Sequence, residues 1–290
     1  MNINMLSLRL SYKRLFFNNF STGADGLCSL SENGKKTLVF LSRTGYDKAK
    51  PKTGRIGSLN HFVEKVENYC SNKLWMMMDY FLDMRICGRS LVKYVPSIFR
   101  DDRRGVGGTG SHSTHYAALE EIFADVRFSP EDRFLDVGCG KGRVLAFLIK
   151  QRCPCMIYGV EYNAEVGKIA AEWTKRYERV KVMIGDAFQI DYNSYTILGL
   201  ARSFLPKTFL SFVETLEKTL THPITLVSWY DQLGGHLLKD RPGWELQKSG
   251  VLDRIRGIKV NSCRQTYSIW VYDPQRMEAV SGEKAKRAEV

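Results

Sequence analysis

The chain contains 290 residues, of which 44% are hydrophobic and 26% are charged, and this ordinary composition excludes a collagen-like, low-complexity or mostly disordered protein. Its 43 Lys and Arg outnumber its 31 Asp and Glu, which gives a formal net charge of +12. A chain of this length can bury most of its apolar surface and needs neither disulfides nor a structural metal to fold. No run of about 18 apolar residues occurs, so we expect no transmembrane segment.

The positive charge is concentrated near the start of the chain. Residues 1–60 contain 10 basic and 3 acidic side chains, and we interpret them as a basic, mostly irregular leader, with contact to an anionic partner as the alternative. Residues 1–20 contain no acid, a pattern that leaves a transit peptide or a membrane-surface helix open. The seven scattered cysteines favour a reduced, cytoplasmic setting.

Three further regions follow the leader. Residues 61–107 are expected to form a helical N-terminal extension, because apolar side chains recur at helical spacing from Phe62 to Leu82. Residues 108–275 are expected to form the main domain, in which a helix begins near Tyr116. Residues 276–290 are predicted to be a charged tail.

Strand and helix patterns alternate along the main domain. Helices are predicted between most of the strands, and this alternation predicts an α/β fold with a doubly wound, mostly parallel seven-stranded sheet. The last two strands have no long helix between them, so we expect an antiparallel hairpin at one edge. The predicted strands cover residues 133–137, 156–160, 180–184, 195–200, 223–230, 244–248 and 265–272.

The turn after the first predicted strand carries the most informative motif. Asp136 is followed by Gly138, Gly140 and Gly142, beside the crevice where doubly wound sheets bind ligands. Glycines allow a sharp turn and a close approach to a ligand. The spacing differs from both the dinucleotide fingerprint and the phosphate-binding loop, and the carboxylate would repel a pyrophosphate. A nucleotide-linked oxidoreductase is therefore disfavoured.

Acidic residues recur at the ends of the next two strands. Glu161 lies 25 residues after Asp136, where an acid can accept hydrogen bonds from both hydroxyls of a ribose. The third strand is followed by Asp186, Ala187 and Phe188. The three strand ends together resemble the class I S-adenosylmethionine-dependent methyltransferases over roughly residues 110–273.

This resemblance implies S-adenosyl-L-methionine as the cofactor and no metal, because the sulfonium already activates the methyl group. The acid after the third strand would lie near the exocyclic amine of the adenine, and its apolar neighbours against the ring. The implied cofactor-binding residues are Thr114, Tyr116, Asp136, Gly138, Cys139, Gly140, Gly142, Glu161, Asp186, Ala187 and Phe188.

The loop before the glycine turn narrows the resemblance. The run of residues 134–144, preceded by residues 108–116, is similar to that of a bacterial-type group of methyltransferases without assigned acceptors, and loosely to the non-SET histone-lysine methyltransferases. This similarity implies that Ser113, Thr114 and Tyr116 lie near the methionine moiety of the cofactor. His112, His115 and Tyr116 are the candidate catalytic residues. The alternative for each histidine is an exposed loop side chain.

The fourth strand end departs from the family pattern. Residues 200–204 lack the Asn and Pro that many members place before an aromatic residue, which weakens the case for methylation of a nucleobase amine. The acceptor therefore stays open among a protein lysine, a small molecule, a glycan and a nucleic acid. We predict methyl transfer by in-line displacement, with a catalytically silent cofactor-binding or scaffold protein of the same fold as the alternative.

Two cations open the helix after the glycine turn. Lys141 and Arg143 oppose the helix dipole at this position. One interpretation is that they contact an acidic acceptor or the carboxylate of the cofactor. The other is a solvated pair that interacts with nearby acids.

Overall fold

The computed structural model describes residues 55–98, 107–230, 235–261 and 263–276. The expected leader up to residue 54 and the tail from residue 277 therefore lie outside the described residues. The first helix, α1, is a single element at Arg55–Cys87, so it begins within the segment that the sequence analysis assigned to the leader. It continues without a break to Cys87. No described helix is long and apolar enough to cross a membrane.

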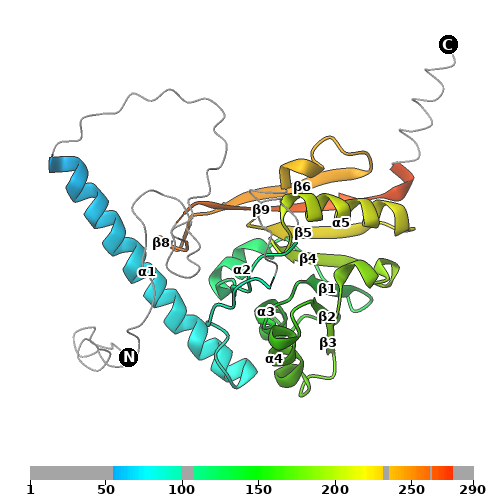
Figure 1. Cartoon of the computed structure of the whole chain (residues 1–290), viewed down its shortest axis with the longest axis horizontal. Helices are drawn as coiled ribbons and strands as arrows, with labels where there is room; N and C mark the ends of the chain where they lie inside the picture. Colours follow the sequence, from blue (N-terminus) through cyan, green and yellow to red (C-terminus); the bar gives the residue numbers. More distant parts are fainter. Residues whose placement is uncertain (1–54, 99–106, 231–234, 262, 277–290) are drawn as a thin grey trace, which may run out of the picture. The chain divides into compact units, whose positions relative to one another are not determined.

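The central sheet has seven strands in the order β3-β2-β1-β4-β5-β9-β6 (Figure 1). The first five pair in parallel, and β9 pairs antiparallel with both β5 and β6. This topology confirms the predicted doubly wound sheet and its antiparallel edge. The strands are β1 Arg133–Val137, β2 Met156–Glu161, β3 Val180–Ile184, β4 Ile197–Ala201, β5 Ile224–Trp229, β6 Trp244–Leu252 and β9 Gln265–Tyr272.

Helices cover both faces of the sheet, as the alternating pattern requires. One buried core joins β1 to α2 and α3, and the other joins the opposite face to α5. Because both faces are covered, the parallel strands are almost continuously apolar. The helices are α2 Tyr116–Ile122, α3 Arg143–Lys150, α4 Ala164–Thr174 and α5 Pro206–Thr219, with 3₁₀ turns η3 Ala187–Gln189, η4 Tyr192–Ser194 and η5 Gly235–Leu238.

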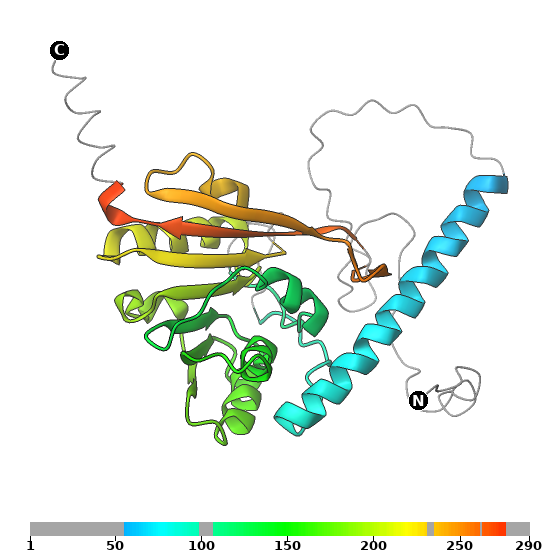
Figure 2. The ribbon, with the colours of Figure 1, turned by 180° about the vertical axis from the view of Figure 1, so that it is seen from behind.

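A small hairpin near the end of the chain contacts α1 (Figure 2). It consists of β7 at Arg254–Ile255 and β8 at Ile258–Lys259, strands too short for the sequence pattern to predict. The Trp75 indole N–H donates to the Lys259 carbonyl at 2.8 Å. Glu67 pairs with Arg254 at 2.6 Å and Glu64 with Lys259 at 3.2 Å. The first and last parts of the described chain are thus in direct contact.

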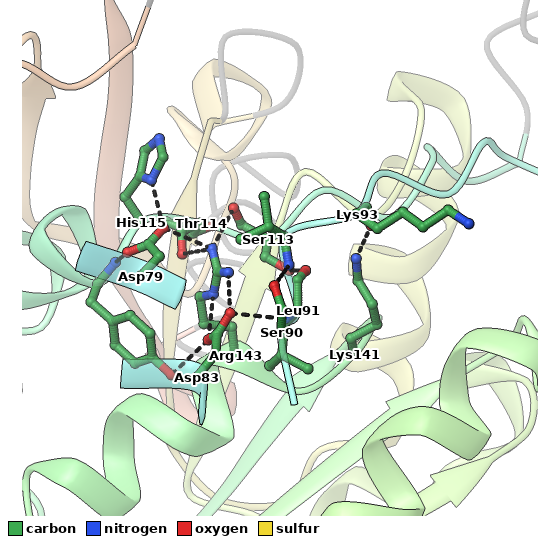
Figure 3. A network of polar contacts seen from close by, with 12 residues as sticks. Asp79, Asp83, Ser90, Leu91, Lys93, Ser113, Thr114, His115, Lys141 and Arg143 are labelled. Atoms are coloured by element: carbon green, nitrogen blue, oxygen red, sulfur yellow. Dashed lines mark hydrogen bonds and ion pairs between the residues drawn. The ribbon is translucent and has the colours of Figure 1, made fainter. Parts of the chain in front are cut away.

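A buried ionic cluster fixes α1 to the sheet domain (Figure 3). The Arg143 guanidinium, at the start of α3, lies between Asp79 and Asp83 of α1. Its Nη1 donates to Asp79 Oδ2 at 2.9 Å, and its Nη2 donates to Asp83 Oδ2 at 2.6 Å. The three side chains are no more than 3% exposed. Asp79 and Asp83 are one helical turn apart, so both carboxylates lie on the face of α1 that meets α3.

The same two carboxylates also order the chain between α1 and the start of α2. Asp83 accepts the Leu91 amide at 2.8 Å and the Tyr116 hydroxyl at 3.1 Å. Asp79 Oδ2 lies 2.7 Å from His115 Nδ1. A buried carboxylate is tolerated only when its oxygens are paired and hydrogen-bonded. The cluster therefore requires α1, α3 and the segment before α2 to be in place together.

We expect Arg143→Met to destabilise the fold by about 3–5 kcal/mol, because it leaves two buried carboxylates without their cation. Urea denaturation followed by tryptophan fluorescence measures the change. Arg89→Met is the matched control, since Arg89 pairs with Glu172 at the surface and exposed pairs contribute about 1 kcal/mol or less. Equal losses in the two variants would contradict a special role for the cluster.

Candidate functional site

The turn between β1 and α3 forms the centre of the site. Gly138, Gly140 and Gly142 have φ angles of +73°, +56° and +88°, a left-handed backbone that side chains with a Cβ rarely adopt. The amides of Gly138 and Cys139 both donate to the Val160 carbonyl at 2.9 Å. The turn is therefore anchored to the carboxyl end of β2.

Two neighbouring loops approach this turn so closely that two of the glycines have no room for a side chain. A Cβ on Gly138 would lie 2.5 Å from Ser203 Oγ, and a Cβ on Gly140 would lie 2.8 Å from Ser111 Oγ. Ser203 also donates from its hydroxyl to the Val137 carbonyl at 2.7 Å. The glycines thus permit the turn, the loop before α2 and the loop after β4 to meet at one edge of the sheet.

Asp136 is the buried acid of this turn. It is 1% exposed, and its Oδ1 has no hydrogen-bond partner among the described residues. Burial, and then the negative charge of Glu161, raise the pKa of Asp136 to about 8. A buried acceptor without a donor is costly, so this oxygen offers a place for a donor or a cation from a ligand.

Glu161 closes the other side of the turn. Its Oε2 accepts the Gly140 amide at 2.8 Å, and its Oε1 accepts the Asn163 amide at 2.9 Å. Burial raises the pKa of Glu161, and the backbone amides of Asn163, Gly140 and Tyr162 oppose that rise. The carboxylate is half-buried and is held in place by the backbone, so its position is set before any ligand binds.

The end of β3 places the third predicted group at the same edge. Asp186 is exposed, and its Oδ1 accepts the Phe188 amide at 2.9 Å. Ala187 is buried, whereas Phe188 is half-buried, with its ring 5.9 Å from that of Phe204 after β4. Asp186 and Phe188 are thus two residues apart, with the Asp186 carboxylate exposed to solvent and the Phe188 ring packed against the core.

The loop before α2 directs most of its predicted site residues into the protein. The Trp229 indole N–H donates to Thr114 Oγ1 at 2.9 Å, and Ser113 Oγ donates to the Leu91 carbonyl at 2.8 Å. His115 and Tyr116 are buried against the two aspartates of α1. Burial, and then the Asp83 charge, raise the pKa of Tyr116 well above its usual range.

His112 is the exposed histidine of this loop. Its ring centroid lies 6.4 Å from that of Tyr94. Atoms around the loop partly desolvate the ring, and this, followed by the positive charges of His115, Arg143 and Lys141, lowers the pKa of His112 to about 4. The shift leaves the exposed His112 imidazole neutral near pH 7.

The two cations, at the start of α3 and just before it, are buried, so the interpretation of a solvated pair is wrong. Arg143 does pair with acids, but inside the protein. Lys141 is 3% exposed and donates to the Lys93 carbonyl. Burial, and then the charge of Arg143, lower the pKa of Lys141 to about 8.

Strained backbone lies at the ends of β4 and β5. Arg202 and Tyr230, the residues directly after these strands, have φ angles of +46° and +57°. Left-handed backbone at a residue other than glycine costs about 1–3 kcal/mol and clusters at functional sites. The sequence pattern did not predict a left-handed backbone at either residue, because strain of this kind depends on the loops that surround the strand ends.

Comparison with known proteins gives a family for part of the chain. Residues 128–219 match a family model described as a methyltransferase domain. These residues run from the approach to β1 to the end of α5 and include the glycine turn and all three acidic strand ends. No curated protein sequence matches the chain.

Solved structures with a similar fold include enzymes of several kinds. An RNA methyltransferase from Salinibacter ruber, in complex with S-adenosyl-L-homocysteine, is 16% identical with a TM-score of 0.42, over 56% of this chain and 92% of its own. A geranyl diphosphate C-methyltransferase from Streptomyces coelicolor A3(2) is 14% identical with a TM-score of 0.41, over 55% and 80%.

We expect Asp136→Asn to stabilise the ligand-free protein at alkaline pH. Because the folded-state pKa of about 8 exceeds the usual value for Asp, the stability that this group contributes is full below about pH 4 and is lost as the pH rises through 8. The amide does not titrate, so the free energy of unfolding at pH 8 should rise by at least about 1 kcal/mol.

Thermal melts from pH 4 to pH 9 measure this difference. The parent protein should lose stability over this range more steeply than the variant. Glu178→Gln, at an exposed position, is the control and should follow the parent curve. Parallel curves for the parent and Asp136→Asn would show that Asp136 has a partner.

Proposed function

We propose that this chain, which carries a class I Rossmann-like methyltransferase domain, transfers the methyl group of S-adenosyl-L-methionine to an acceptor bound at the carboxyl edge of the sheet. One observation carries the proposal. Asp136 is a buried carboxylate with an unpartnered oxygen, set in a turn of three left-handed glycines next to Glu161. An acid in this place suits a cationic, hydroxyl-rich ligand and would repel a pyrophosphate.

In this proposal Asp136 accepts a hydrogen bond from the amino group of the methionine moiety. The raised pKa of Asp136 in the ligand-free protein means that burial makes this carboxyl costly to ionise. A positive ligand group nearby would favour the ionised carboxylate and offset that cost, which supports the assignment. The energy that burial costs this group would then be recovered on binding. The glycines leave the backbone open to a close approach by the same moiety.

Glu161 holds the ribose in this proposal. A carboxylate oxygen has two acceptor sites, and each oxygen of Glu161 uses one site for a backbone amide, from Gly140 or from Asn163. The second site of each oxygen can accept a hydroxyl hydrogen. The two backbone amides fix the carboxylate in position, so little ordering remains to be done when the sugar binds.

The end of β3 supplies the adenine contacts. Asp186 uses one oxygen to accept the Phe188 amide and retains acceptor sites for the exocyclic amine. Ala187 and Phe188 offer the apolar contact to the ring. Phe188 packs against Phe204 and Phe212, so its position is set by the core.

When bound, the cofactor supplies a methyl group that its sulfonium has already activated. The chain then has to position the acceptor in line with this group and exclude water. His112, exposed and neutral near pH 7, is the proposed acceptor of a proton where the nucleophile must lose one. The contacts of His115 and Tyr116 with α1 favour a positioning role for these two residues.

The proposed acceptor side lies between the ends of β4 and β5. Both strands end in a residue with strained backbone, Arg202 and Tyr230, and Arg202 is exposed. The acceptor itself stays open among a protein lysine, a small molecule, a glycan and a nucleic acid. The departure of residues 200–204 from the Asn-Pro pattern makes a nucleobase amine the weakest of these.

Calorimetric titration with S-adenosyl-L-homocysteine tests the cofactor site. We expect Asp136→Ala to weaken binding by about 100-fold or more, and Glu161→Gln by about tenfold, because each loses charge-assisted hydrogen bonds in a buried place. Glu178→Gln is the control and should bind like the parent. Unchanged affinity in Asp136→Ala would remove the basis of the proposal.

Transfer of radiolabelled methyl groups into fractionated cell extract tests the activity. We expect label in one fraction with the parent protein and none with Asp136→Ala. Binding of the cofactor product without any transfer across protein, nucleic-acid, glycan and small-molecule fractions would instead favour the catalytically silent alternative.

A further inference from the structure

The outer face of α1 carries an exposed apolar stripe. The stripe consists of six residues, most of them three or four positions apart along the helix. The exception is the step of eight from Tyr69 to Met77, and Lys73 lies at its midpoint. Such steps place all six on one side of the helix. Phe62, Tyr69 and Phe81 are 60% exposed or more. The members of the stripe are Phe62, Val66, Tyr69, Met77, Phe81 and Met84.

The two faces of α1 are reversed relative to an ordinary surface helix. Its packed face holds two aspartates in the buried ionic cluster, whereas its solvent face is apolar. No other described helix or strand lies beyond α1 in either view of the molecule (Figures 1 and 2). Contiguous apolar surface of this kind marks a contact with a protein or a membrane.

The charges beside the stripe identify the kind of partner. Lys65, Lys73 and Arg85 are exposed, and each lies four residues from a member of the stripe. None of the three forms an ion pair with an acid among the described residues. Glu64 and Glu67 form ion pairs with basic side chains of the β7-β8 hairpin. The chain that precedes α1 continues this excess, because residues 1–54 hold 9 basic and 3 acidic side chains. The matching partner is therefore both apolar and anionic.

A second copy of this chain fits the stripe less well. Lys73 is midway between the first and last members of the stripe. A symmetric pair of α1 helices, parallel in register or antiparallel, would bring Lys73 against Lys73 of the other copy at the centre of the contact. Like charges at such a seam are destabilising. At a bilayer surface, in contrast, a lysine stem lies along the apolar layer while its ammonium reaches the headgroups.

We propose that the outer face of α1 docks on an anionic lipid surface. The stripe enters the boundary between headgroups and acyl chains, and Lys65, Lys73 and Arg85 lie among the negative headgroups. Binding of this type depends on both apolar burial and anionic lipid. The buried ionic cluster on the opposite face would hold the sheet domain at that surface. This inference is independent of the proposed cofactor site.

Flotation of the full chain with vesicles tests the proposal. We expect the protein to float with vesicles of phosphatidylcholine containing 30 mol% phosphatidylglycerol and to bind pure phosphatidylcholine at least about tenfold more weakly. Added salt should weaken the binding to the anionic vesicles. Absence of binding to either vesicle would overturn the proposal.

Matched variants separate the stripe from the rest of the chain. Tyr69→Ser with Phe81→Ser should lower vesicle partitioning by roughly 10- to 100-fold, and Lys73→Glu by about tenfold. Leu246→Ser with Val251→Ser, on exposed apolar residues of β6, should leave it unchanged. Thermal melts should show the parent transition in each variant, since the altered side chains are exposed.

Two results would contradict the docking of α1 on lipid. Equal vesicle binding by the parent and by Tyr69→Ser with Phe81→Ser would assign the binding to another part of the chain. A dimer in light scattering that this double variant converts to a monomer, with no vesicle binding by the parent, would assign the stripe to an interface between copies.

Discussion

The fold depends on one buried cation held by two carboxylates. Arg143 begins the helix that follows the glycine turn, and its partners Asp79 and Asp83 lie on α1, far away in the chain. Charges in an apolar interior are stable only when every partner is present. This requirement joins α1, the loop before α2 and the glycine turn next to Asp136 into one unit. The geometry of the candidate site therefore depends on a helix outside the matched methyltransferase residues.

The buried aspartates of this unit differ in whether their oxygens have hydrogen-bond partners. Asp79 and Asp83 are fully engaged in the ligand-free protein, whereas Asp136 is buried with an oxygen that lacks a donor. The engaged pair adds rigidity and the unsatisfied acid costs stability. A protein tolerates such a cost where a ligand will remove it. The contrast distinguishes two buried aspartates that hold the fold together from a third that we propose contacts the cofactor.

Local signals in the sequence were enough to predict the sheet, its antiparallel edge and the glycine turn. Each of these depends on neighbours in the chain: alternating apolar strands, or three glycines after Asp136. The destinations of Arg143, His115 and Tyr116 could not be predicted, because their partners are 33 to 64 residues away in the chain. The one available signal was a pair of aspartates, four residues apart, in the otherwise apolar stretch at residues 74–84 of α1. The roles assigned to the strand-end acids stay predictions.

The ion pairs between α1 and Arg143, and the pairing of β4 with the later strands, limit how far the protein can be shortened. The matched residues 128–219 contain Arg143 but neither of its aspartates, and they exclude β5, β9 and β6. Such a fragment would have an unpaired interior guanidinium and an uncovered edge at β4. The smallest autonomous folding unit therefore extends from α1 through β9, well beyond the part that carries the family signature.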